Sequence, residues 1–323
     1  MIKFTSLQTD TCTFAMERLS RGQLQIVAGL TFGSLGLLWL WRRLAVRRGR
    51  AALKDKVVLI TGASSGVGEA CAHAFYRVGS KVILCARRIK ELERVKNDLS
   101  SLKLTTPTHP PCILPLDLED LEGIPKKAQE ALALHGRVDI LINNGGMTSK
   151  GAVEDTEMSV HQKVMTINYF GSVALTKELL LSMIANKCGH IVAISSVQGK
   201  IAIPYRSAYG ASKHAMNAFF DCLRAEVAQH KINVTVVSPS YIKTNISYNA
   251  VTADGTRHGE MDRNIATGMS TDYVVKKILQ AVIQKQGDLV LGPFHHRLAI
   301  YVRVLSPRLY DWLMALRARG GDV

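Results

Sequence analysis

Short apolar runs separated by polar or helix-like stretches organise most of this chain. Four of these runs are rich in β-branched or other apolar side chains and predict strands. They lie at residues 57–60, 81–85, 138–142 and 234–237. The first run leads through Gly62, Gly66 and Gly68 into an alanine-rich stretch that predicts a helix. A strand, a glycine turn and a helix in this order direct free N–H groups and a helix dipole at one point, which suits a pyrophosphate.

The glycine spacing, G-x3-G-x-G, differs from the commoner G-x-G-x-x-G, so each glycine needs its own physical reason. We expect Gly62 to allow the sharp turn and Gly66 to let the backbone approach the phosphates. We expect Gly68 to permit close packing of the helix on the strand. Because a clean strand precedes the turn and a helix follows it, a dinucleotide site is favoured over an ordinary strand–helix loop.

The residues after the second predicted strand indicate which dinucleotide would bind. Arg87 and Arg88 are adjacent there, and no acid lies between residues 81 and 90. An acid near this point usually holds a free ribose 2′-hydroxyl, whereas an arginine accommodates a 2′-phosphate. The pattern therefore favours NADP(H) over NAD(H), with a solvated basic loop as the alternative. Asp117 follows the third strand, where it could accept a hydrogen bond from the adenine amino group or cap the following helix.

A candidate proton-transfer site lies in the second half of the chain. Tyr209 and Lys213 are four residues apart in a predicted helix and so share one face. The ammonium beside the phenol is expected to lower the tyrosine pKa towards working pH, as proton exchange with an alcohol or carbonyl oxygen requires. Ser196 ends an apolar run upstream. Asn168 lies in an apolar helical segment, where it would be either structural or part of a proton relay.

Together these motifs resemble the short-chain dehydrogenase/reductase family. TGASSGVG, NNGG, Asn168, Ser196 and Tyr209-x-x-x-Lys213 occur in the order and spacing of that family, over about residues 54–292. The resemblance implies an α/β fold, a single doubly wound parallel-sheet Rossmann domain. It also implies a catalytic tetrad: Tyr209 as general acid/base, Lys213 lowering its pKa and holding the nicotinamide ribose, Ser196 orienting the substrate oxygen, and Asn168 holding a water that links Lys213 to solvent.

The same resemblance implies a set of cofactor-binding residues at the matching motif positions. They are Thr61, Gly62, Ser64, Ser65, Gly66, Val67, Gly68, Arg87, Asp117, Leu118, Asn144, Gly145, Tyr209, Lys213 and Thr244. Two positions depart from the family pattern. Gly145 replaces the usual alanine of Asn-Asn-Ala-Gly, which should be harmless because a smaller residue fits. Ser240 replaces the glycine of Pro-Gly after the sixth strand, which is expected to tighten the nicotinamide pocket.

The walls of the substrate site should come from two loops. Residues 241–270 form a long polar stretch without a clear period, as lids do. They begin where ligands bind in open α/β sheets, beyond the carboxyl ends of the strands. The loop after Ser196, with Ile201, Ile203 and Tyr205, is expected to supply an apolar wall.

The N-terminal segment predicts a membrane anchor. Residues 24–41 contain no charge and end in Trp39 and Trp41, after a tail at 1–23 and before a basic linker at 42–53. The run is just long enough to span a bilayer, and tryptophan suits its interface. Basic residues are concentrated after the run, so the positive-inside rule places the catalytic domain in the cytosol.

Composition sharpens this picture without changing it. The net charge of +15 could suggest nucleic acid, but many of the basic residues follow the apolar run directly, which favours anionic lipid instead. Six cysteines show neither close pairs nor metal-ligand spacing, as in a reducing compartment, so no metal is expected. The C-terminal extension, residues 293–323, mixes apolar residues with five arginines. It would either cap the core or lie on the membrane surface.

The anchor and the segment HIVAISSVQGKIAIPYRSAYGASKHA further resemble the membrane-associated member 7 group of the family, particularly its 7B-like branch. That resemblance implies lipophilic substrates at the endoplasmic reticulum membrane or, alternatively, the peroxisomal membrane. The expected function is hydride transfer between NADP(H) and a lipophilic ketone or secondary alcohol, as a carbonyl reductase. A catalytically weak Rossmann-fold binding or scaffolding protein is the alternative. Pairing of two copies through the helices that carry Asn168 and Tyr209 is also implied.

Overall fold

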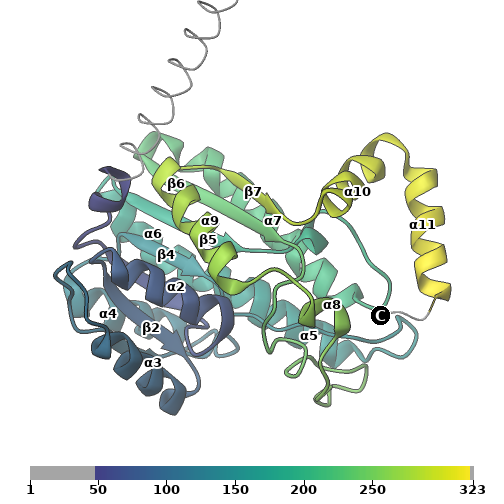
Figure 1. The fold of residues 1–323 in the computed structure, drawn as a ribbon, viewed down its shortest axis with the longest axis horizontal. Helices are drawn as coiled ribbons and strands as arrows, with labels where there is room; N and C mark the ends of the chain where they lie inside the picture. The colour runs from purple at the N-terminus through teal and green to yellow at the C-terminus, as the bar shows by residue number, and fades with distance from the viewer. Residues whose placement is uncertain (1–47, 321–323) are drawn as a thin grey trace, which may run out of the picture. The chain divides into compact units, whose positions relative to one another are not determined.

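Seven parallel strands form one sheet in the computed structural model, which describes residues 48–320 (Figure 1). Their order is β3-β2-β1-β4-β5-β6-β7. The strands are β1 (Val57–Thr61), β2 (Lys81–Ala86), β3 (Cys112–Pro115), β4 (Ile140–Asn143), β5 (Gly189–Ile194), β6 (Ile232–Pro239) and β7 (Asp288–Leu291). The direction of strand order reverses between β1 and β4, so the predicted doubly wound α/β fold is confirmed.

Helices cover both faces of the sheet. One face carries α2 (Gly66–Arg77), α3 (Ile89–Ser101) and α9 (Thr271–Gln284). The other face carries α4 (Ile124–His135), α6 (Gly171–Ala185) and α7 (Ser207–Glu226). Two short helices, η2 (Val197–Gly199) and η3 (Ala228–His230), lie in the connections before and after α7.

Alternate side chains of each central strand therefore enter two different cores. In β1, Val57 and Leu59 pack under α4, α6 and α7, whereas Val58 and Ile60 pack under α2, α3 and α9. A strand that is buried on both faces must be apolar at every position, which is why the run reads as continuous rather than alternating. Each such side chain contributes about 1.5–3 kcal/mol of burial free energy.

The helix before β5 contains one irregular turn. α5 (Met158–Met165) continues through the π-helical turn η1 (Thr166–Phe170) into α6. Asn168 occupies this turn and is fully buried. Single π-helical turns of this kind often accompany functional sites, because the extra residue in the turn re-aims a side chain.

The connection from β6 to α9 has more regular structure than its sequence indicates. Residues 241–270 contain the short helix α8 (Arg263–Ala266) and isolated bridges from Ser149 to Val251 and from Ile242 to Met269. Contacts between residues distant in sequence order this segment, although most of its backbone is irregular, as its lack of periodicity indicates. This connection starts at the carboxyl edge of the sheet, where the glycine turn after β1 also lies.

The C-terminal extension forms two helices, α10 (Phe294–Leu305) and α11 (Pro307–Arg319), which lie beyond β7 at one end of the domain (Figure 1). Tyr310 is the one residue of these helices that is buried. The extension is thus attached to the domain surface and does not cap the main core.

The predicted membrane anchor at residues 24–41 lies outside the described residues. Within residues 48–320, no helix combines the length and the hydropathy that a membrane span requires. Residues 48–53, assigned to the basic linker, include Leu53, which is buried against the core on the α2 face.

Candidate active site

The turn after β1 has a backbone conformation that glycine adopts readily. Gly62 and Gly66 have φ values of 66° and 60°. A Cβ atom on Gly62 would lie 2.8 Å from Asn144 Nδ2, and one on Gly68 would lie 2.3 Å from the carbonyl oxygen of Gly62. The turn and the close helix packing expected of Gly62 and Gly68 are therefore present, and side chains at either position would fill the cradle.

The cradle opens onto a cleft at the N-terminus of α2. No side chain caps α2, so the free N–H groups of its first turn are left for an anion. The cleft contains all the residues predicted to bind cofactor except Gly68, Tyr209 and Lys213. Its lining from these predictions is Thr61, Gly62, Ser64, Ser65, Gly66, Val67, Arg87, Asp117, Leu118, Asn144, Gly145 and Thr244. A glycine cradle facing an uncapped helix end fits the pyrophosphate of a nicotinamide dinucleotide.

The NNGG segment is fixed to the glycine turn by Thr61. Thr61 Oγ1 accepts hydrogen bonds from the N–H groups of Asn144 (3.0 Å) and Gly145 (2.8 Å). Asn144 Nδ2 donates to the carbonyl oxygen of Thr61 at 2.9 Å. These contacts join the ends of β1 and β4, so they stabilise the cleft at the point where the strand order reverses.

Gly145 does more than replace alanine with a smaller residue. A Cβ atom at this position would lie 2.6 Å from Leu118 Cδ1 and 3.2 Å from Thr61 Oγ1. Leu118 is buried and fills the space that an alanine methyl group would need. The expectation that the exchange is merely harmless is therefore incomplete, because the glycine makes room for Leu118.

Three arginines line the cleft, and two of them, Arg87 and Arg88, follow β2; of the three, only Arg87 was predicted to bind cofactor. Arg87 Nη1 lies 3.9 Å from both Asp117 Oδ1 and Glu119 Oε2, and its side chain is 61% exposed. Arg88 Nη2 donates to the hydroxyls of Ser64 and Ser65, each at 2.9 Å. Arg88 is thus the arginine that contacts the glycine turn, and its adjacency to Arg87 was the only sequence signal for it.

Asp117 does not cap the next helix. Its Oδ1 accepts the N–H of Glu119 at 3.0 Å, whereas α4 starts only at Ile124. The helix-cap alternative is wrong, because a turn separates the strand from the helix. Asp117 remains in the cleft lining, beside Arg87.

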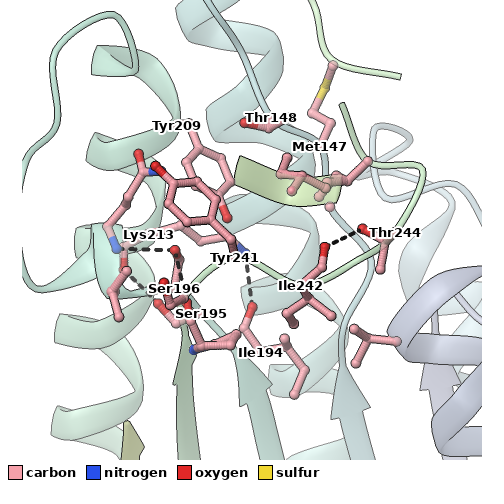
Figure 2. A pocket seen from close by; sticks show the side chains of 18 of the residues that line it. Met147, Thr148, Ile194, Ser195, Ser196, Tyr209, Lys213, Tyr241, Ile242 and Thr244 are labelled. Carbon is pink, nitrogen blue, oxygen red and sulfur yellow. Dashed lines mark hydrogen bonds between the residues drawn. The ribbon is translucent and has the colours of Figure 1, made fainter. Parts of the chain in front are cut away.

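The proton-transfer residues meet in a second pocket. It shares six lining residues with the dinucleotide cleft, namely Val67, Asn144, Gly146, Met147, Thr244 and Ile246. Tyr209, Lys213 and Ser196 all line this pocket (Figure 2). α7 carries the first two, and Ser196 follows β5 directly. The order of the parallel strands brings the end of β5 next to the end of β4, and so brings Ser196 next to the cleft.

Lys213 and Tyr209 interact differently from what their spacing suggests. Lys213 Nζ donates to the carbonyl oxygen of Ile194 at 2.9 Å and lies 5.7 Å from the centroid of the Tyr209 ring. Burial raises the pKa of Tyr209, while a hydrogen bond with Ser196 and the charge of Arg206 oppose that rise. Burial also lowers the pKa of Lys213 to about 8.

The effect of Lys213 on the tyrosine pKa stays a prediction, and burial is the largest influence on that pKa in this arrangement. The ammonium group faces the Ile194 carbonyl, and burial disfavours the charged form of both groups. Ser196 and Arg206 are the groups that favour phenolate here. Arg206 was not predicted, because its electrostatic effect on Tyr209 depends on the fold and no local sequence motif indicates it.

Asn168 does not line this pocket, but it is hydrogen-bonded to the backbone of Met147, which does. Its Oδ1 accepts the N–H of Met147 at 2.8 Å, and its Nδ2 donates to the Met147 carbonyl and to Ser212 Oγ, each at 2.9 Å. A Cβ atom at Gly146 would lie 3.0 Å from Asn168 Oδ1 and 3.8 Å from Lys213 Nζ. These contacts show the structural role of Asn168, and they place Gly146 between its side chain and Lys213.

The apolar wall of the pocket comes mainly from one of the two expected loops, residues 241–270. Tyr241, Ile242, Ile246 and Ile265, all within residues 241–270, line it. Ile201, Ile203 and Tyr205 are absent from the lining, so that part of the prediction is wrong. Tyr205 instead turns outward, because its hydroxyl donates to the carbonyl oxygen of Ala318 in α11 at 3.0 Å.

Ser240, the residue that replaces the family's glycine, lines the pocket and contacts the C-terminal extension. Its Oγ lies 2.5 Å from His296 Nδ1, and the Tyr241 hydroxyl accepts a hydrogen bond from Arg317 at 3.1 Å. The extension thus holds two residues of the pocket wall in place. No local sequence pattern indicates this link, because the contacts join residues 56 and 76 positions apart in the chain.

Comparisons with known proteins agree with this geometry. The family described as short chain dehydrogenase matches residues 56–254. The Drosophila melanogaster protein "Dehydrogenase/reductase SDR family protein 7-like" is 53% identical over 284 residues, or 88% of this chain and 87% of that protein. The Rattus norvegicus protein "Dehydrogenase/reductase SDR family member 7B" is 53% identical over 291 residues, or 90% of each.

Solved structures share the fold. A short-chain dehydrogenase from Streptomyces avermitilis is 29% identical with a TM-score of 0.67, covering 84% of this chain and 100% of that chain. A metagenomic short-chain oxidoreductase in complex with NADP is 26% identical with a TM-score of 0.60, covering 75% and 98%. The glycine cradle, the Tyr209–Lys213–Ser196 pocket and these similarities lead to one conclusion: the chain belongs to the short-chain dehydrogenase/reductase family of oxidoreductases.

Proposed function

We propose that this protein is a membrane-anchored reductase that transfers a hydride between NADP(H) and a lipophilic ketone or secondary alcohol, working as a carbonyl reductase. One observation carries the proposal. Tyr209 and Ser196 line a pocket with apolar walls, and that pocket adjoins the cleft with the glycine cradle. A proton donor next to a dinucleotide site is what the reduction of a carbonyl group needs.

Each side chain has a separate task in this reaction. A nicotinamide held in the adjoining cleft would supply the hydride for the carbonyl carbon. Tyr209 gives its proton to the carbonyl oxygen, and burial, which raises the pKa of Tyr209, keeps the phenol protonated before the transfer. Ser196 orients the carbonyl oxygen through its hydroxyl. Lys213, whose ammonium group donates to the Ile194 carbonyl, would hold the ribose of the nicotinamide.

Arg87 and Arg88 favour NADP(H), the dinucleotide that carries a 2′-phosphate, over NAD(H). Arg87 and Arg88 follow β2 and line the cleft. Arg88 also donates hydrogen bonds to the hydroxyls of Ser64 and Ser65. A 2′-phosphate accepts strong charge-assisted hydrogen bonds from such groups. Solved structures with this fold are described in complex with NAD as well as with NADP, so the proposed preference rests on the two arginines.

The pocket lining supports a lipophilic substrate. Met147, Val197, Ile242, Ile246 and Ile265 supply most of its apolar side chains. Polar side chains such as Thr148 and Gln198 also line the pocket, so the apolar share of the lining is what favours a lipophilic substrate. A substrate of this kind partitions into membranes, which agrees with the predicted anchor at residues 24–41, with the catalytic domain in the cytosol. We place the protein at the endoplasmic reticulum membrane, with the peroxisomal membrane as the alternative.

The test is NADPH and NADH oxidation by the full-length protein over a panel of lipophilic ketones, with product identification by mass spectrometry. We expect NADPH to be preferred and the product to be the secondary alcohol. The Tyr209→Phe variant should lose turnover while it still binds NADPH. Tyr248→Phe is the control, because Tyr248 is 39% exposed and outside both pockets. Turnover that survives Tyr209→Phe would refute the assignment.

A further inference from the structure

The two C-terminal helices expose apolar side chains at helical spacing. On α10 they are Phe294, Leu298, Tyr301 and Leu305, and on α11 they are Leu309, Trp312, Leu313 and Leu316. Exposure reaches 77% for Phe294, 81% for Leu305 and 58% for Trp312. Spacings of three and four residues place each set on one face of its helix. Apolar faces of this extent mark interaction surfaces in soluble domains.

These faces are outward because the opposite sides of the helices are fastened to the domain. Tyr310 is buried, and its hydroxyl donates to the carbonyl oxygen of Ala202. Arg303 donates to the carbonyl oxygen of Lys200 at 2.7 Å, and Arg317 donates to the Tyr241 hydroxyl at 3.1 Å. The helices are therefore attached in part through polar contacts, and among the described residues their apolar stripes stay partly to largely exposed.

The charges around the stripes are almost all positive. α10 and α11 together contain five arginines and Asp311 as their one acid. Arg297, Arg308 and Arg319 are exposed, so they are available to an anionic partner. An aromatic residue at the rim of the stripe, Trp312, is of the kind that favours the interface between lipid and water.

We propose that the apolar stripes of α10 and α11 form a docking surface for an anionic lipid bilayer. Amphipathic helices with arginines beside an apolar face of Trp, Phe and Leu bind such surfaces by combining apolar burial with attraction to anionic headgroups. A second copy of the chain is a poorer occupant, because pairing would bring the basic residues of two copies together. This surface is separate from the predicted N-terminal anchor and lies on the helices that hold Ser240 and Tyr241 at the pocket.

Trp312 makes the proposal directly measurable. The chain has three tryptophans, and the other two are Trp39 and Trp41. In the full-length Trp39→Phe/Trp41→Phe variant, all tryptophan emission comes from Trp312. The probes are vesicles of phosphatidylcholine and phosphatidylserine in which the phosphatidylcholine acyl chains are brominated, compared with the same vesicles without bromine. We expect brominated chains to quench at least half of the emission, and added salt or omission of phosphatidylserine to weaken this quenching.

Val304→Glu/Leu305→Glu, added to that background, should abolish most of the quenching, because both residues are exposed on α10. Met158→Glu is the matched control, since Met158 is 69% exposed on α5, and quenching should persist. Cooperative thermal unfolding verifies that each variant is folded. Two results would overturn the proposal: Trp312 emission that brominated lipid leaves unchanged, or shielding of Trp312 that depends on protein concentration and not on vesicles, which would assign the surface to a second copy.

Discussion

Arg206 and Asp262 form a buried ion pair, with 2.9 Å between Nη2 and Oδ2. Arg206 precedes α7, which carries Tyr209, and Asp262 caps α8 in the segment that walls the pocket. Arg206 also donates to the carbonyl oxygen of Ser149 at 3.0 Å. The pair therefore ties the pocket wall to the helix that carries the proton donor.

Removing one partner of this pair should be costly. Arg206→Met leaves the Asp262 carboxylate buried without a counter-charge, and we expect a loss of about 3–5 kcal/mol in the free energy of unfolding. Arg206→Met combined with Asp262→Leu should recover most of that loss, because no charge is then buried. Urea denaturation of the three proteins checks both expectations. A single variant as stable as the native protein would show that the pair has little energetic role.

The two arginines after β2 should decide the choice of dinucleotide. We expect Arg87→Ala/Arg88→Ala to raise the Kd of NADPH about 10- to 100-fold, since a lost hydrogen bond to a charged group costs about 1.5–3 kcal/mol. The Kd of NADH should change little, because NADH has no 2′-phosphate. Titration by cofactor fluorescence measures both, with Lys90→Ala as a control at an exposed neighbouring position outside the cleft. Equal weakening for NADPH and NADH would contradict the proposed preference.

Lys213 should destabilise the fold at neutral pH. Burial lowers its pKa from the ordinary 10.5 to about 8, so below pH 8 the folded state bears the whole cost of a buried ammonium, about 3 kcal/mol. Between pH 8 and 10.5 the unfolded chain binds more protons than the folded one, so stability rises with pH and the cost fades. Lys213→Met should therefore be the more stable protein at pH 7, with the advantage gone near pH 10.5.

The same variant should lose turnover, because it lacks the ammonium group in the pocket. Urea denaturation at several pH values measures the stability difference. The lost hydrogen bond to Ile194 reduces the gain by about 1 kcal/mol. A difference that stays constant from pH 7 to pH 10.5 would show that burial of Lys213 is not its source.

Gly145 and Leu118 should be energetically coupled. Gly145→Ala places a methyl group 2.6 Å from Leu118 Cδ1, and we expect a cost of about 1–3 kcal/mol from overpacking. Leu118→Val removes that terminal methyl group, so the double variant should lose less stability than the sum of the single variants. A double-mutant cycle measured by denaturation gives the coupling energy. Strict additivity would mean that Leu118 moves aside freely.

Much of the fold was predictable because its signals are local. The first predicted strand, 57–60, became Val57–Thr61, and the second, 81–85, became Lys81–Ala86. Both strands are buried on two faces, so their sequences are apolar without interruption. The positive φ angles of Gly62 and Gly66 are likewise a property of a few adjacent residues.

The residue-level contacts of the site were harder to predict because they join distant segments. Arg88 reaches Ser64 and Ser65 only because β1 and β2 are neighbours in parallel register. The spacing of Tyr209 and Lys213 correctly indicated a shared helix, but the direction of the lysine depends on the carbonyl of Ile194. A side chain selects its hydrogen-bond partner from the groups that the fold brings within reach.

By itself, the amino-acid sequence determined the alternation of strands and helices, the glycine cradle and the residue types that handle the proton. Those features follow from periodicity and from backbone conformations available to single residues. Only the tertiary structure decided that the Lys213 ammonium donates to the Ile194 carbonyl, and that α10 and α11 hold Ser240 and Tyr241 at the pocket. Burial and long-range hydrogen bonds depend on the packing of the whole chain, so no local pattern encodes them.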